Sequence, residues 1–408
     1  AGLTLRNFDG DGLRIENAAS NTIGACSTDG RWNRLTGNHG YGVRVIGEPS
    51  DNTLIAINQI GHNGATAQGN HLGGILVDDG PDTTTIGCQS WVGQSIGGNL
   101  GPGVTLRGTN TDVVSFYRTT IGGAGLGNLG VGLLIDGVDD VTNARSSPVS
   151  QFLVSQNGQD GIRVVAGSAI RFDFQSMSSG PSDRSALENN GGLGFNLVGT
   201  NDPPNGVTPN DEGDGDSGPN GLLNAPVLDP VVALGSGNFQ VAGRACAGCR
   251  VTLYVADGDP SGSGEAKTKL TNSTANASGV FSATVQLSPG DLVTATATDA
   301  GNNMSELAID VAGPRSLRVD TTTDLSLTGC LAATPADCSL RGALTVAQTG
   351  DYIQFDATVF STATPGVINV SSALPSVAAG KLTFDGDYRA VIIDGAAAPA
   401  GTDGLVVT

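Results

Sequence analysis

The segment NHGYGVRV, residues 38–45, carries the pattern that decides the fold: an asparagine, three residues, a glycine, and then an alternating apolar strand. The same pattern recurs along the first half of the chain. The asparagine and glycine pairs are Asn38/Gly42, Asn70/Gly74, Asn99/Gly103, Asn128/Gly132, Asn157/Gly161 and Asn190/Gly194. Successive asparagines lie 32, 29, 29, 29 and 33 residues apart. A near-constant step of this size indicates a repeat architecture in which each unit stacks on the one before it.

Apolar residues alternate with others after each glycine, as Val43 and Val45 do after Gly42. A period of two turns one face of a β-strand toward a core. All the repeated strands share one phase, so each is expected to lie directly above the last. A coil of about 30 residues has room for three short strands and their turns. The sequence therefore predicts a right-handed parallel β-helix over residues 1–200.

The repeated asparagines have a physical role in this arrangement. Asparagine tolerates the left-handed turn conformation, and its side-chain amide can bond to the next coil. The alternative is a set of separate turns that face solvent. Because the offset between asparagine and glycine is constant, we expect a hydrogen-bonded ladder along the stack, formed by Asn38, Asn70, Asn99, Asn128, Asn157 and Asn190.

The pattern changes after residue 200. Residues 201–226 are rich in Asp, Gly and Pro, which indicates a linker. Residues 227–312 contain several short alternating strands between turn residues, typical of an immunoglobulin-like β-sandwich. Residues 313–408 hold one short helix candidate, beginning at Ser339, followed by further strands. The predicted fold class is therefore all-β: a parallel β-helix plus an immunoglobulin-like sandwich.

Charge and hydropathy exclude two classes of partner. The chain has 20 Lys and Arg against 39 Asp and Glu, a net charge of −19. Without a basic patch it is not expected to bind nucleic acid or anionic membranes. No run of residues approaches the ~20 apolar positions of a transmembrane helix, so membrane insertion is not expected. The acidity is consistent with simple solubility, or with an environment rich in calcium.

The six cysteines fall into three pairs, which favours an oxidising and extracellular compartment. The predicted disulfides are Cys330/Cys338, Cys246/Cys249 and Cys26/Cys88. Zinc is an alternative for Cys246 and Cys249. No second C-x-x-C and no nearby histidine would complete four ligands, however.

The linker contains the best candidate for a metal site. Its alternating oxygens lie in a short glycine loop, and calcium takes six to eight oxygen ligands in flexible geometry. The spacing is not that of an EF-hand, and a plain polar hinge is the alternative. The candidate ligands are Asp211, Asp214, Asp216 and Asn220, with Asn210 and Glu212 beside them.

Catalysis is the serious alternative, since many parallel β-helices act on polysaccharides. Pectin hydrolases need neighbouring aspartates as acid and base, and only the fragments His39-Gly40 and Asp78-Asp79 occur here. Acidic residues follow the repeated strands and would form a ridge, either solvated or able to hold calcium or a sugar. They are Glu48, Asp51, Asp78, Asp79, Asp82, Asp112, Asp136, Asp139 and Asp140. We predict no catalytic site and no enzyme.

Several stretches match a known family. NTIGACSTDGRWNRLTGNHGYGVRV (21–45) resembles the N-T-I-G-G rungs of bacterial surface right-handed parallel β-helix proteins. VTPNDEGDGDSGPNGLLNAPVL (207–228) and TATATDAGNNMSEL (294–307) resemble the linker and Ig-like module that follow such rungs. TGCLAATPADCSLRGAL (328–344) resembles the C-S-L-R-E-A-I segment that opens them, with Gly342 in place of the glutamate.

The order of these parts differs from that family, in which the C-S-L-R segment comes first and the Ig-like module last. Joining GLVVT (404–408) to AGLTLRN (1–7) restores the family order. We therefore expect the β-helix to continue from Thr408 of one copy into Ala1 of the next, as a tandem array or as stacked subunits; an engineered circular permutant is a further alternative. This predicts a structural module of an extracellular filament or cell-surface layer whose partners are copies of itself. A carbohydrate-active enzyme and an adhesin for surface glycans remain the alternatives.

Overall fold

The computed structural model describes most of the chain. The described residues are 2–26, 32–88, 92–143, 151–175, 185–200, 202–203, 206–235, 238–288, 290–313, 315–330, 334–348, 351–376, 382–386 and 389–406. They form two compact units. The first comprises Ala1–Leu228, Gly243–Phe281 and Val293–Asp310, and the second comprises Asp229–Ala242, Ser282–Leu292 and Val311–Thr408. The region 227–312, predicted as one sandwich, is thus shared between the two units.

Three parallel sheets form the β-helix of the first unit, and successive strands of the chain belong to the first, second and third sheet in turn. The first sheet contains β1 (Thr4–Arg6), β4 (Asn33–Thr36), β7 (Asn58–Ile60), β10 (Gln94–Ile96), β13 (Thr119–Gly122), β16 (Phe152–Ser155) and β18 (Ala186–Glu188). The second contains β2 (Leu13–Glu16), β5 (Tyr41–Ile46), β8 (Gly73–Asp78), β11 (Val104–Arg107), β14 (Leu133–Asp136), β17 (Ile162–Ala166) and β19 (Phe195–Leu197). The third contains β3 (Thr22–Ile23), β6 (Leu54–Ile55), β9 (Thr85–Gly87), β12 (Asp112–Tyr117) and β15 (Asp139–Thr142).

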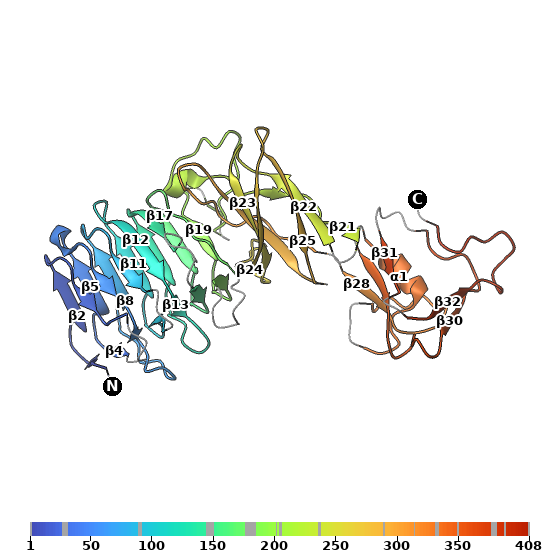
Figure 1. Cartoon of the computed structure of the whole chain (residues 1–408), viewed down its shortest axis with the longest axis horizontal. Coiled ribbons are helices and arrows are strands. Elements are labelled where there is room, and N and C mark those ends of the chain that lie inside the picture. The colour runs from blue at the N-terminus through green and yellow to red at the C-terminus, as the bar shows by residue number, and fades with distance from the viewer. Residues whose placement is uncertain are drawn as a thin grey trace. The chain divides into compact units, whose positions relative to one another are not determined.

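This topology confirms the parallel β-helix that the repeat predicts. Figure 1 shows the second sheet as a row of strands from β2 at one end to β19 at the other, coloured from blue to green. The register pairs Val43 with Ile75, and Ile75 with Val104, so one inward position repeats on successive coils. All three side chains are fully buried. A continuous apolar core along the stack follows from the strand phase.

Aromatic rings fill this core toward the later coils. Phe152 lies 5.0 Å from Phe116 and 5.2 Å from Phe172, measured between ring centroids. Phe174 continues the series and packs edge-on against Tyr254 at 6.2 Å. Because Tyr254 belongs to an antiparallel strand, the core of the β-helix continues into the residues that cover its last coil.

Antiparallel strands cover that end of the stack. In the first unit β23 (Arg250–Ala256) pairs with β24 (Ala266–Thr274) and lies beside β26 (Leu292–Thr298) in one sheet. The other strands of the region are β20 (Val227–Leu228), β21 (Val232–Gly235), β22 (Asn238–Arg244), β25 (Val280–Gln286) and β27 (Val311–Ala312). The described residues also include two short 3-10 helices: η1 (Glu48–Ser50), between β5 and β6, and η2 (Pro219–Leu222), between β19 and β20. Antiparallel sheets are therefore present where the sequence predicts a sandwich.

The second unit contains another set of parallel strands. β28 (Ser316–Val319), β29 (Tyr352–Phe355) and β31 (Thr383–Asp385) form one sheet, and β30 (Gly366–Asn369) pairs with β32 (Val391–Asp394). Their inward side chains, with those of α1 (Leu340–Val346), enclose a separate core. The last segment thus begins a second parallel stack, as the sequence predicts.

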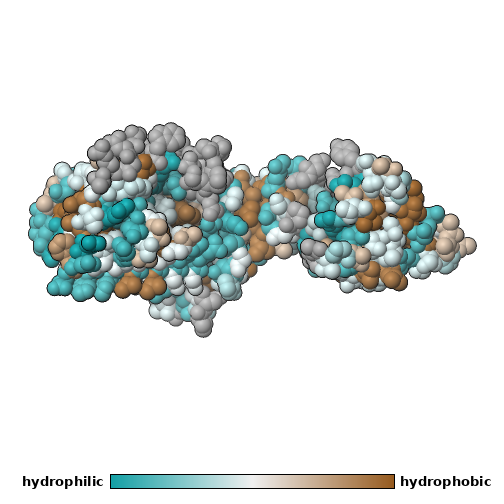
Figure 2. Space-filling view, turned by 90° about the horizontal axis from the view of Figure 1, so that it is seen from below, coloured by the Kyte–Doolittle hydropathy of each residue, from teal (hydrophilic) through white to brown (hydrophobic). Residues whose placement is uncertain are grey.

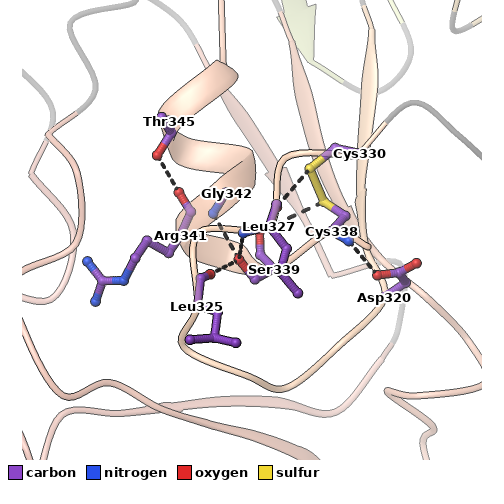
Figure 3. The surroundings of a disulfide bond; sticks show 9 residues. All are labelled: Asp320, Leu325, Leu327, Cys330, Cys338, Ser339, Arg341, Gly342 and Thr345. Atoms are coloured by element: carbon purple, nitrogen blue, oxygen red, sulfur yellow. Dashed lines mark hydrogen bonds between the residues drawn. A yellow bond between two sulfur atoms is a disulfide. The ribbon is translucent and has the colours of Figure 1, made fainter. Parts of the chain in front are cut away.

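The predicted helix at Ser339 is confirmed, and its start is tied to the preceding loop. The Ser339 hydroxyl accepts from the backbone N–H of Gly342 and donates to the carbonyl of Leu325, an N-cap arrangement that Figure 3 shows. Gly342 lies against the backbone of Leu327, where a Cβ would come within 1.6 Å of the carbonyl oxygen. This contact gives a physical reason why glycine stands where the resembled family has glutamate.

Candidate functional site

The asparagine ladder is present and continuous from Asn38 to Asn190. The Nδ2 of each asparagine donates to the Oδ1 of the next, over distances of 2.8, 2.9, 2.8, 2.8 and 2.9 Å. The backbone N–H of each one donates to the same oxygen. The Oδ1 atoms from Asn70 to Asn190 therefore each accept two hydrogen bonds, Oδ1 of Asn38 accepts from the backbone N–H of Phe8, and the whole ladder has one direction along the stack.

The ladder ends on a carboxyl group that sequence reasoning missed. Asn190 donates through Nδ2 to Oε1 of Glu265 over 2.7 Å and through its backbone N to Oε2 over 2.9 Å. Glu265 precedes β24 and is fully buried. Desolvation by this burial raises the pKa of Glu265 to about 9, although the two hydrogen bonds from Asn190 oppose the rise. A glutamate 75 residues away leaves no periodic signal in the sequence.

A second buried glutamate, Glu306, accepts a hydrogen bond from the final strand of the stack. The carboxylate of Glu306 accepts from the backbone N–H of Leu197, in β19, and from that of Thr208, each over 2.9 Å. Burial raises the pKa of Glu306 to about 8, and the charges of Asp202 and Asp160 add to the rise. The motif TATATDAGNNMSEL contains Glu306, but nothing in that motif shows which backbone groups the residue meets.

The predicted acidic ridge is in part a second ladder. The carboxylate of Asp51 accepts from the backbone N–H of Asp82, that of Asp82 from Asp112, and that of Asp112 from Asp139. Asp139 in turn accepts from Ser168. Burial, and then the neighbouring aspartates, raise the pKa of Asp112, while the bond from the Asp139 backbone opposes this. These carboxylates hold successive coils together, which is a structural role.

Three of the predicted metal ligands lie together. One carboxylate oxygen from each of Asp211, Asp214 and Asp216 lies within 4.8 Å of the other two, and all three residues are exposed. Burial raises the pKa of Asp216, and the charges of Asp211 and Asp214 raise it further. The group lies beside a cavity of about 400 Å³ that Asp202 and Asp216 help to line. Three carboxylates can give calcium half of its usual ligands, with water supplying the rest.

The prediction that Asn220 is a fourth ligand is wrong. Its side chain is buried and already bonded on both ends: Oδ1 accepts from the backbone N–H of Ile170, and Nδ2 donates to the carbonyls of Ile170 and Met304. The residue therefore joins η2 to the β-helix. Asn224 organises the acidic loop instead, since it bonds both Asp211 and Asp214.

The fragments considered for catalysis are engaged elsewhere. Asp78 forms a double hydrogen bond with Arg107, at 3.0 Å to Nε and 2.6 Å to Nη2. Nδ1 of His39 lies 3.2 Å from a carboxylate oxygen of Asp9, and its ring contacts the tilted ring of His71, with 4.6 Å between the ring centroids. Asp78 is thus held as half of an ion pair on the outer face of the second sheet.

Figure 2 shows one face of the surface, where hydrophobic residues form small groups among hydrophilic ones.

Two of the three predicted disulfides are present. Cys330 and Cys338 are linked across eight positions, and Cys246 and Cys249 across three. Figure 3 shows that the first disulfide lies beside the N-cap of α1, where the backbone N–H of Cys338 also donates to Asp320 over 2.9 Å. The disulfide and the cap together fix the loop that precedes α1.

The third predicted disulfide, Cys26 with Cys88, is wrong, because neither cysteine is part of a disulfide. Cys26 follows β3 and Cys88 follows β9, while β6 lies between these two strands. Two strand spacings amount to roughly 9.6 Å. A disulfide needs its Cα atoms within about 6.8 Å. Their similar place in two loops gave the wrong pairing because the loops belong to coils that are not adjacent.

Comparison with protein-family models and with curated proteins finds no match to this chain. Among the described residues, no helix has the length and apolar character needed to cross a membrane.

Proposed function

We propose that this protein is a structural module that assembles head to tail through continuation of its β-helix, in an extracellular filament or cell-surface layer. The observation that supports this is the open first coil. Within the described residues, β1, β2 and β3 each pair with a single neighbour at the end of a sheet. The hollow there measures about 170 Å³ and is lined by apolar side chains, among them Leu3, Leu5, Leu13 and Ile23.

The second unit offers a surface of the same construction. Phe384 stacks on Ile353 and Ile393 stacks on Ile368, so both continue inward rows of that core. Ile353 and Ile368 are buried, whereas Phe384 and Ile393 are each 38 % exposed. An unpaired strand edge above an exposed core row is a template for another strand. We propose that the coil of β31 and β32 in another copy pairs with the open first coil.

The finer parts of the fold belong to the same proposal. A right-handed coil follows from the usual hand of parallel crossovers, and an immunoglobulin-like arrangement is our interpretation of the antiparallel strands. The contact between Ala1 and Thr408 lies outside the described residues. Since the joined surfaces differ, the contact is heterologous and does not close, which generates filaments. The disulfides favour an oxidising, extracellular location.

Two substitutions test the open coil. Leu5→Asp and Leu13→Asp place a charge on the first coil, and we expect both to abolish concentration-dependent association in sedimentation velocity and filaments in negative-stain images. Leu129→Asp is the control, because Leu129 is 64 % exposed on a turn in the middle of the stack and should leave assembly unchanged. Wild-type protein that stays a monodisperse monomer at all concentrations contradicts the proposal.

The alternatives have their own readouts. A carbohydrate-active enzyme would release unsaturated or reducing-end products from acidic polysaccharides, and Asp78→Asn would abolish the release. A glycan array tests the adhesin. The ion pair of Asp78 with Arg107 favours the structural function over the enzyme, because both oxygens of the carboxylate are occupied.

A further inference from the structure

The joint between the last coil of the β-helix and the antiparallel strands is made by carboxyl groups. Glu265 accepts two hydrogen bonds from Asn190, the last residue of the asparagine ladder, and Glu306 accepts one from the backbone N–H of Leu197. Both glutamates are at least 96 % buried, with exposures of 0 % and 4 %. Each one belongs to the antiparallel region and each bonds the final coil, so opening the joint would bring both into water.

Further carboxylates face these two groups. Asp257 follows β23 and accepts from the backbone N–H groups of Glu265 and Asn189, each over 2.9 Å. Its negative charge acts on Glu265 directly. On the neighbouring strand β18, Glu188 is also buried, and Asp310 bonds the N–H of Gly264, next to Glu265. The side of the joint around Glu265 is therefore acidic.

The surroundings of Glu306 are similar. Asp202 accepts from the backbone N–H of Gly199 over 2.7 Å, and Asp160 accepts from that of Leu193 over 2.9 Å. Both carboxylates act on Glu306 through their charge. The nearby cation Arg163 is bonded to Asp160 at 2.6 Å. An ionised Glu306 would thus add a buried negative charge beside two others.

We propose that this joint is a proton-controlled clasp, which is closed while Glu265 and Glu306 hold protons and opens as they lose them. In the closed form both carboxyl groups are neutral, and their oxygens still accept from the N–H groups of Asn190 and Leu197. Loss of both protons leaves a negative charge on each glutamate. Asp257 repels the charge on Glu265, and Asp202 and Asp160 repel the charge on Glu306. The inference concerns the far end of the stack and does not depend on assembly at the first coil.

The direction of the pH dependence follows from the raised pKa values. In the open joint both carboxyls return toward an ordinary pKa of 4.5, whereas the closed values are about 9 for Glu265 and about 8 for Glu306. The closed form binds the protons more tightly. Its stability is therefore complete below about pH 4.5 and is lost as the pH rises toward 8 and 9. Each group can change the opening equilibrium by up to about tenfold per pH unit.

Hydrogen exchange tests the clasp at its own amides. After correction for chemical exchange rates, we expect the protection of the Asn190 and Leu197 amides to fall by about tenfold or more per unit between pH 6 and pH 8. The amide of Asn99 is the internal reference, because its acceptor is Oδ1 of Asn128, which does not titrate. Protection at Asn190 and Leu197 that is constant, or that changes in parallel with Asn99, overturns the proposal.

A neutral variant provides the complementary test. Glu265→Gln with Glu306→Gln removes both titrating groups, and the pH dependence at Leu197 should disappear. Glu48→Gln is the matched control, since Glu48 is exposed on η1 and should keep the wild-type dependence. If the double variant does not fold, carbon-13 titration of the wild-type carboxyl groups decides. Midpoints above 7 support the clasp, and midpoints near 4.5 overturn it.

Discussion

The side-chain amide of Asn128 donates to Oδ1 of Asn157 over 2.8 Å, across 29 positions of sequence. The backbone N–H of Asn128 donates to the same oxygen over 3.2 Å. Asn128 is 1 % exposed. Water therefore cannot replace Asn157 as the acceptor, and the two asparagines depend on each other for satisfied hydrogen bonds.

Removing this acceptor should be costly. Asn157→Ala removes the acceptor of the Asn128 backbone N–H and of one N–H of its side-chain amide, while Nδ2 keeps its bond to the carbonyl of Ile96. Each buried N–H that loses its partner costs about 1–3 kcal/mol. We expect the free energy of unfolding in urea to fall by about 3 kcal/mol. Leu129→Ala is the matched control on the same turn and should change it by less than about 0.5 kcal/mol. Equal effects of the two substitutions would show that the ladder contributes nothing specific.

The aromatic column should be the most sensitive part of the core. Phe152→Ala removes a fully buried ring in contact with Phe116 and Phe172. Such truncations cost about 3–5 kcal/mol, and thermal unfolding should show the loss as a lower midpoint. Phe8→Ala serves as the control, because Phe8 is 50 % exposed on the first coil. A midpoint unchanged by Phe152→Ala would contradict a packed core at this position.

The cysteines can be sorted by reactivity. Peptide mapping without reductant should find Cys330 linked to Cys338, and a double substitution to serine should cost about 2–3 kcal/mol in the chain-entropy model of disulfide stabilisation. Under native conditions a thiol reagent should label the exposed Cys26 at once and the buried Cys88 only after unfolding. A peptide that links Cys26 to Cys88 would contradict the strand order.

Calcium binding at the acidic loop stays a prediction. Isothermal titration with calcium chloride checks it. We expect binding that Asp214→Asn abolishes, because one of three clustered carboxylates is lost. Asp79→Asn should not alter it, since Asp79 is an exposed aspartate on another part of the stack. Titration heats equal to those of dilution would leave the loop as a polar connection.

The sequence predicts most of the β-helix because its signals repeat. A strand phase shared by Val43, Ile75 and Val104 forces one inward row, and a fixed offset from each asparagine forces the ladder. The helix after Ser339 and the disulfide before it were also predictable, since both depend on residues within about ten positions of each other. The ladder of Asp51, Asp82 and Asp112 was visible only as acidity.

Contacts between distant segments could not be found in this way. The neighbours of Asn220 in sequence predict a calcium ligand, yet its side-chain oxygen accepts from the backbone N–H of Ile170, 50 positions earlier. The similar loops of Cys26 and Cys88 predict a disulfide, yet the coil of β6 lies between the two coils that carry them. In both cases the sequence gives the residue's local setting, while its partner depends on which coils and strands are adjacent in space.

The sequence by itself determined that this chain stacks, because a period of two within strands and of about 30 between them can bury an apolar face only in parallel coils. Only the tertiary structure decided how the stack ends. Glu265 accepts two hydrogen bonds from Asn190, 75 positions away, and Glu306 accepts one from Leu197, 109 positions away. A contact that occurs once has no period. Its energy comes from burial and hydrogen bonds that exist only after the antiparallel strands have packed against the last coil.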